Sequence, residues 1–91
     1  MIRLTGVIDL ETAPMVRQML NDVIGTSGVR VRVDGSDVEF IDSVGVSALM
    51  VAHARCVAQG GSLVIEGASE RLRATLESIG VADLLLATLR P

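Results

Sequence analysis

Aromatic residues are almost missing from this 91-residue sequence, in which Phe40 is the only Phe, Tyr or Trp. Proteins that bind single-stranded nucleic acid stack the bases on aromatic side chains, and one aromatic residue offers no such platform. Lysine is absent, and the eight arginines are outnumbered by eleven acidic residues, which leaves a net charge of -3. Binding to a phosphate backbone depends on a surplus of basic groups. Nucleic acid is therefore not expected as a partner.

Cysteine and long apolar segments are also scarce. Cys56 is the single cysteine, so the chain cannot form an internal disulfide, and it suits a reducing compartment. A strand-like alternation begins at Ile2, where a secretory signal would have a continuous apolar segment. The longest stretch without a charged side chain, residues 43–54, is too short to cross a bilayer. We expect a cytoplasmic protein that does not insert into a membrane.

Aliphatic residues are abundant, since hydrophobic residues make up 49% of the chain. A chain of this length can bury one core of aliphatic and Met side chains. No repeat, linker or low-complexity segment divides the sequence. We therefore expect a single domain over residues 1–91.

Apolar periodicity predicts strands and helices that alternate along the chain, which indicates an α/β sheet with right-handed crossovers. A strand is predicted over residues 1–9 with a bulge at Gly6, followed by a helix with Thr12 as its N-cap and Gly25 as a left-handed C-cap. Next come a predicted strand at 29–33, an acidic turn at 34–39 and a helix at 43–59 that Gly60 and Gly61 stop. A strand at 62–66 and a short strand at 84–86 are also predicted. Between them lies a predicted helix that begins at Ser69, stops at Gly80 and has Leu72, Leu76 and Ile79 on one face.

The stretch EFIDSVGVSALM, residues 39–50, places Asp42 and Ser43 where a strand becomes a helix rich in small apolar residues. Both are preferred N-cap residues, because their oxygens accept hydrogen bonds from free helix N–H groups. Alternatively, the Ser43 hydroxyl is a group on which a partner acts, and a helix N-terminus favours an added phosphate. Gly45 would let the backbone approach closely just after the serine. Asp9 would lie at the same sheet edge if the first two strands are neighbours.

Enzymatic hypotheses find little support in the sequence. A catalytic Ser43 would need a general base within hydrogen-bonding reach, and the only imidazole, His53, is ten residues further along the same predicted helix. His53 falls on the apolar side of that helix, among Val46, Leu49 and Val57, and is expected to be a packed structural residue. Cys56 lies on the same side and is expected to be a buried, inert thiol. No metal-ligand spacing or phosphate-binding loop is present, so neither a metal nor a cofactor is expected.

Three segments, LTGVID at 4–9, FIDSVGV at 40–46 and GGSL at 60–63, together resemble the STAS domain family, named for sulfate transporters and anti-sigma factor antagonists. The resemblance covers essentially the whole chain. It points above all to the single-domain bacterial anti-sigma factor antagonists, also called anti-anti-sigma factors. It implies an α/β fold with a mixed β-sheet and helices packed on one side.

The resemblance also implies a function. In these antagonists the serine directly after the aspartate, here Ser43, is phosphorylated by an anti-sigma factor that is also a serine kinase. The unphosphorylated antagonist binds the anti-sigma factor and frees the sigma factor, whereas the phosphorylated form does not bind. The antagonist is not an enzyme, because ATP and the catalytic base belong to the partner. The implied partner-binding positions are Asp9, Asp42, Ser43, Val44, Gly45 and Val46.

Two departures from the family pattern leave a second reading open. Val44 stands where the family usually has Ser or Thr, and the usual first strand and long C-terminal helix are expected to be absent. A missing strand would expose a sheet edge that a second copy could cover, so a homodimer is a further alternative. The second reading is a STAS subunit that does not switch, in a lipid-transporting ATP-binding-cassette system or a signalling scaffold.

Overall fold

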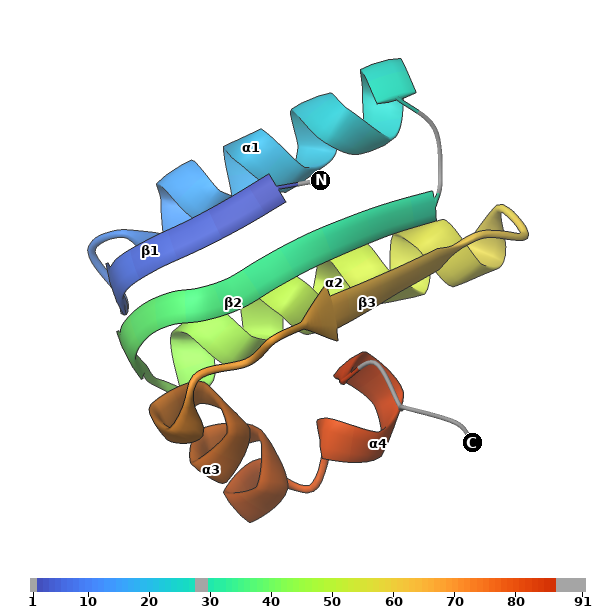
Figure 1. Cartoon of the computed structure of the whole chain (residues 1–91). Helices are drawn as coiled ribbons and strands as arrows, with labels where there is room; N and C mark the ends of the chain where they lie inside the picture. Colours follow the sequence, from blue (N-terminus) through green and yellow to red (C-terminus); the bar gives the residue numbers. More distant parts are fainter. Residues whose placement is uncertain (1, 28–29, 87–91) are drawn as a thin grey trace.

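The computed structural model describes residues 2–27 and 30–86 (Figure 1). Strands and helices alternate through most of this part of the chain, which confirms the predicted α/β class. Met1 and Val29, both predicted to be strand residues, lie outside the described ranges. The elements in chain order are β1 (Ile2–Ile8), α1 (Ala13–Ser27), β2 (Arg30–Ile41), α2 (Ser43–Ala58), β3 (Ser62–Glu66), α3 (Glu70–Ile79) and α4 (Ala82–Leu85).

The sheet has the strand order β1-β2-β3, and both strand pairs are parallel. Consecutive strands are joined through a helix, α1 or α2, and such a crossover returns the chain in the same direction. The mixed sheet implied by the family resemblance is therefore wrong for residues 2–27 and 30–86, where every strand pair is parallel.

One face of the sheet carries the core and the other face is open. Side chains along all three strands alternate between buried and more exposed positions, which is the pattern of a sheet covered on one side. In Figure 1, α1 and α2 lie behind the sheet. The buried aliphatic side chains of strands and helices form one cluster, completed by Leu72, Leu76 and Leu85, each 0% exposed. This pattern agrees with the predicted packing of helices on one side.

β2 is longer than predicted, because residues 34–39, expected to form an acidic turn, continue the strand. The prediction depended on the sequence DGSD, whose residue types are common in turns. Gly35 is buried, and a Cβ atom at this position would lie only 2.5 Å from Leu72 Cδ2 of α3. The glycine therefore permits close packing of α3 against β2, and the chain does not turn there.

Two register shifts between β1 and β2 absorb the extra residues of the long strand. Between Arg3 and Thr5 of β1, the paired residue in β2 advances from Asp34 to Asp37, and a second shift follows Gly6. Gly6 has a left-handed φ of 75°, which side chains other than glycine rarely adopt. The predicted bulge at Gly6 is thus confirmed, although the extra residue lies in the partner strand.

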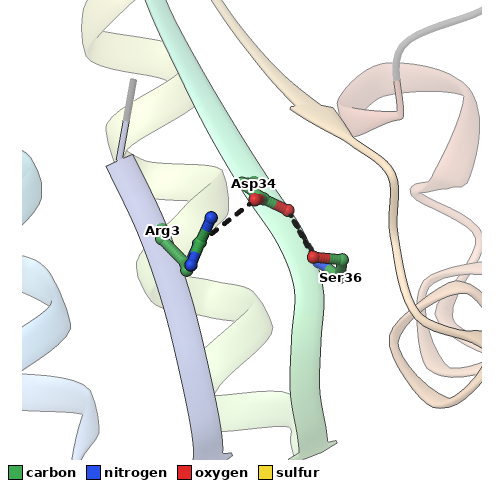
Figure 2. Close-up of polar contacts among 3 residues, drawn as sticks. All are labelled: Arg3, Asp34 and Ser36. Carbon is green, nitrogen blue, oxygen red and sulfur yellow. Dashed lines mark hydrogen bonds and ion pairs between the residues drawn. The ribbon is translucent and has the colours of Figure 1, made fainter.

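Figure 2 shows the side-chain contacts at the first shift. Asp34 Oδ1 accepts hydrogen bonds from the Ser36 amide at 3.0 Å and from the Ser36 hydroxyl at 2.7 Å. Asp34 Oδ2 lies 3.3 Å from Arg3 Nε on the neighbouring strand. The bonds from Ser36, more than the nearby guanidinium, lower the pKa of Asp34 below its ordinary value. The local bonding expected of a turn is therefore present, but inside a strand.

The ends of α2 and α3 confirm the predicted stop signals. Gly60 follows α2 with a left-handed φ of 82°. The Ser69 side chain caps the N-terminus of α3, and Gly80 ends that helix with a φ of 91°. Ile79, predicted to lie on the apolar face, is 46% exposed, because the helix ends at this residue.

Two other predicted element ends are wrong. Gly25 does not stop α1, which continues to Ser27 without a left-handed φ at the glycine. Residues 84–86, predicted as a strand, belong mostly to α4, and only Leu86 forms a parallel bridge, to Ile65 of β3. The helical turn buries Leu85 in the core, where it is 0% exposed.

Candidate functional site

The residues singled out by the sequence meet at one edge of the sheet. β1 and β2 are parallel neighbours that end together, with Ile8 opposite Ile41. The Asp42 amide donates a hydrogen bond to the Ile8 carbonyl at 3.1 Å. Asp9 and Asp42 therefore follow adjacent strand ends, which confirms the conditional prediction that Asp9 shares this edge with the start of α2.

Asp42, and not Ser43, caps α2. Its Oδ1 atom accepts hydrogen bonds from the Val44 amide at 2.9 Å and the Gly45 amide at 3.0 Å. Ser43 is the first residue of the helix and is exposed. Its hydroxyl has no hydrogen bond to any residue that the structure describes. From the sequence, either residue could have been the cap. In the structure the Asp42 side chain is the cap, and the serine hydroxyl makes no capping hydrogen bond.

Gly45 allows the start of α2 to press against the strand ends. A Cβ atom at this position would lie 2.8 Å from Ile41 Cγ1, 2.8 Å from Ile8 Cγ2 and 2.8 Å from the Ile8 carbonyl oxygen. Gly45 and Val46 are both buried, the latter 3% exposed. These two residues therefore belong to the packed side of the helix start, whereas Val44 is half-buried.

The loop from Asp9 to Thr12 is held by a dense set of hydrogen bonds. Asp9 Oδ1 accepts from the Glu11 amide at 3.0 Å and the Thr12 amide at 3.2 Å. The Thr12 hydroxyl donates to the Val7 carbonyl at 2.8 Å and accepts from the Asp9 amide at 2.9 Å. Thr12 stands at the predicted N-cap position, since α1 begins at Ala13 and the Thr12 carbonyl accepts a hydrogen bond from the Val16 amide at 3.3 Å. Its side chain does not cap the helix, because the hydroxyl bonds back to β1 and to its own loop. The result is a well-defined loop at the same sheet edge as the start of α2.

Leu10 is a surface residue that the sequence analysis missed. It lies on the hydrogen-bonded loop and is 73% exposed, with the exposed Glu11 next to it. An apolar residue between two acidic ones, outside the alternating pattern of the preceding strand, is the signal that could have identified it. The edge of the sheet thus presents a leucine, a serine hydroxyl and several carboxylates.

A family model described as "Mlab, STAS domain" matches residues 1–88 of the chain. The chain belongs to the STAS domain family. This finding confirms the resemblance carried by the three sequence segments.

Several known relatives of this STAS domain are named anti-sigma factor antagonists. The anti-sigma-B factor antagonist of Bacillus subtilis is 31% identical over 84 residues, which cover 92% of this chain and 76% of that protein. The anti-sigma-B factor antagonist of Listeria monocytogenes is also 31% identical, over 92% of this chain and 74% of the relative. The crystal structure of an anti-sigma factor antagonist from Mycobacterium paratuberculosis superposes with a TM-score of 0.81 at 25% identity, over 96% of this chain and 74% of that one.

His53 and Cys56, the other two residues with side chains that could take part in catalysis, lie away from Ser43. His53 is half-buried, with Nδ1 3.4 Å from the Leu63 carbonyl oxygen, and the ten-residue separation puts it about 15 Å along the helix from Ser43. Cys56 is fully buried, and burial raises the pKa of its thiol. Within the described ranges, no cluster of His, Cys, Asp or Glu could hold a metal ion. No helix in the same ranges is both long and apolar enough to cross a membrane.

Proposed function

We propose that this STAS domain is an anti-sigma factor antagonist that binds an anti-sigma factor with serine kinase activity and is switched off by phosphorylation of Ser43. The observation that carries the proposal is the exposed Ser43, whose hydroxyl has no hydrogen bond to the described residues because Asp42 supplies the cap. The names of the relatives in Bacillus and Listeria support the same class of partner.

The geometry suits modification by another protein. A kinase that transfers a phosphoryl group to Ser43 Oγ does not have to break a hydrogen bond that stabilises the fold. The kinase supplies ATP, the metal ion and the catalytic base, since the only imidazole of this chain lies well away along α2.

Phosphorylation would change the electrostatics of this edge strongly. A phosphoserine carries about 1.5 to 2 negative charges at neutral pH. The amides of Val44 and Gly45, which a phosphate at a helix N-terminus would otherwise use, already bond to the Asp42 carboxylate. The new dianion would therefore lie beside Asp42, with Asp9 at the neighbouring strand end and little local compensation.

In this proposal the partner contacts the exposed and half-exposed residues of the edge: Asp9, Leu10, Asp42, Ser43 and Val44. A surface that fits a small neutral hydroxyl would meet both extra bulk and unpaired charge after phosphorylation. Mismatched charges at an interface cost several kcal/mol. We therefore expect Ser43→Glu to weaken binding at least tenfold, which is about 1.4 kcal/mol.

The test uses the anti-sigma serine kinases encoded in the same genome, purified and examined one at a time. Each is incubated with the protein and ATP, and the modified peptide is mapped by mass spectrometry. Ser47, exposed one turn further along α2, provides a matched control. Phosphorylation should disappear in Ser43→Ala and persist in Ser47→Ala. Phosphate on Ser47 with Ser43 unmodified would overturn the assignment.

A second candidate function is a STAS subunit that binds its partner constitutively, in a lipid-transporting ATP-binding-cassette system or a signalling scaffold. Val44 favours it, because the position after Ser43 lacks the second hydroxyl of the usual family pattern. The two functions predict different results for Ser43→Glu. Unchanged binding of a folded Ser43→Glu variant, measured by titration calorimetry, would exclude the switch and favour the constitutive subunit.

A further inference from the structure

The outer face of α2 is unusual for an exposed helix because it has almost no charge. We call it the α2 outer face and define it by the exposed uncharged residues after Ser43, which are Ser47, Val51, Ala54, Val57 and Ala58; Arg55 is exposed at its edge. Val51 is 54% exposed and Val57 is 52% exposed. A surface helix normally has polar and charged side chains on its outer side. Such a continuous apolar face is typical of an interaction surface.

The one formal charge of α2 does not interrupt this face. Arg55 donates a hydrogen bond to Asn21 Oδ1, so its guanidinium is directed towards α1. The other long helices differ, since α1 exposes Arg17 and Asp22. The exposed positions of α3 include several charges as well, from Glu70 to Glu77. The absence of charge is therefore a particular property of α2 and not of the protein surface in general.

The α2 outer face begins at Ser43 and continues along the helix. We propose that it is the docking surface for an amphipathic helix of the anti-sigma factor, packed along α2 with its apolar stripe between Val51 and Val57. This inference relies on the proposed function for the identity of the occupant. It extends the contact well beyond the sheet edge that surrounds the serine.

Two features indicate a helix as the occupant. Small side chains at Ser47, Ala54 and Ala58 let a second helix axis come close, and the two valines form ridges that fit between its side chains. At the Ser43 end, Asp9 and Asp42 follow adjacent strand ends, and we expect their carboxylates to face basic residues at one end of the docked helix.

The position of Ser43 favours the anti-sigma factor over a second copy of this chain. A partner that covers the α2 outer face also reaches Ser43, so phosphorylation would disturb the same interface that the partner uses. A second copy seated on this face would instead shield the serine from its kinase. One heterologous partner therefore accounts for both the apolar face and the accessible hydroxyl.

The test introduces charge on the face and measures the affinity for the anti-sigma kinase that phosphorylates Ser43. Val51→Lys and Val57→Lys should each weaken binding at least tenfold, because lysine suits an exposed helix position but not an apolar contact. Leu84→Lys is the matched control, since Leu84 is 53% exposed on α4, outside the face. The control should bind like the unmodified protein, and thermal melts should show that all three variants are folded.

A parallel measurement with Ser43→Glu separates this inference from the proposed function. If Ser43→Glu weakens binding and the two valine variants do not, the docking surface is wrong while the switch stands. If the valine variants alone weaken binding, the docking surface stands and the switch is wrong. Sedimentation of the free protein provides another check. A dimer that Val51→Lys dissociates would assign the face to a second copy and overturn the inference.

A labelling experiment tests the contact without depending on affinity. Val57→Cys is labelled with an environment-sensitive fluorophore; Cys56 is buried with a raised thiol pKa, so it should not react in the folded protein. Addition of the kinase should shift the emission to shorter wavelength, because the label becomes covered. The same label at Leu84→Cys should not respond. An unchanged spectrum at position 57 under saturating kinase would overturn the proposal.

Discussion

Replacement of Asp42 and Ser43 by alanine, one at a time, should separate capping from signalling. Asp42→Ala removes the acceptor of two amide hydrogen bonds at the start of α2, at 2.9 and 3.0 Å. Loss of an N-cap side chain costs about 1 kcal/mol, within a range of about 0.5–2 kcal/mol. In a domain of this size, that loss corresponds to a melting temperature about 4–8 °C lower.

Ser43→Ala should behave differently, because the serine hydroxyl has no hydrogen bond among the described residues. Substitutions at such surface positions usually change the free energy of unfolding by less than about 0.5 kcal/mol, and alanine is the better helix former. Asp42→Asn retains a capping oxygen and loses only the charge beside the helix N-terminus, a change of about 0.3–1 kcal/mol.

Urea denaturation followed by circular dichroism would measure the three free energies of unfolding at pH 7. The expected order of destabilisation is Asp42→Ala first, Asp42→Asn second and Ser43→Ala last. If Ser43→Ala destabilises the domain as much as Asp42→Ala does, then the serine is a structural cap. In that case the central observation behind the proposed switch is lost.

Three further predictions test other parts of the protein. Gly45→Ala should destabilise the domain by about 1–3 kcal/mol, because its Cβ would lie 2.8 Å from the Ile8 carbonyl oxygen; an unchanged urea midpoint would contradict this. The pKa of Asp34 is lowered by the Ser36 bonds, so the stability that it contributes is present above its ordinary pKa of about 3.9 and is lost as the pH falls through the lower folded-state value. Asp34→Asn should therefore flatten the fall of the melting temperature below about pH 4, and an identical acid profile would refute the assignment. Leu10→Ala should weaken binding of the anti-sigma kinase while leaving the melting temperature unchanged, since the side chain is 73% exposed; unaltered affinity in calorimetry would remove Leu10 from the interface.

The local features of the site were largely predictable from the sequence. The change from strand to helix at residues 40–43, the stop at Gly60 and the cap at Ser69 all depend on residues close together in the chain. Apolar period, capping side chains and left-handed glycines act over a few residues, so a short window contains the whole cause. The three segments that resemble the STAS family are likewise short stretches that can be recognised from neighbouring residues alone.

Predictions from local patterns were wrong where a contact between distant segments determined the structure. The residues DGSD predict a turn, yet the strand continues because Gly35 makes room for Leu72 of α3. The apolar residues 84–86 predict a strand, yet α4 forms and buries Leu85 in the shared core. In both places the free energy of packing between remote segments outweighs the local preference.

Which side chains meet at the Asp42–Ser43 junction, and that a helix begins there, follows from the amino-acid sequence alone. Which of the two residues is the cap became clear only in the folded protein, where the Asp42 amide bonds to Ile8 of the neighbouring strand and its carboxylate accepts a hydrogen bond from the Val44 amide. The same holds for the exposure of Leu10 and of the two valines on α2. A helix or loop has several faces, and the packing of the other elements determines which of them remains in contact with solvent.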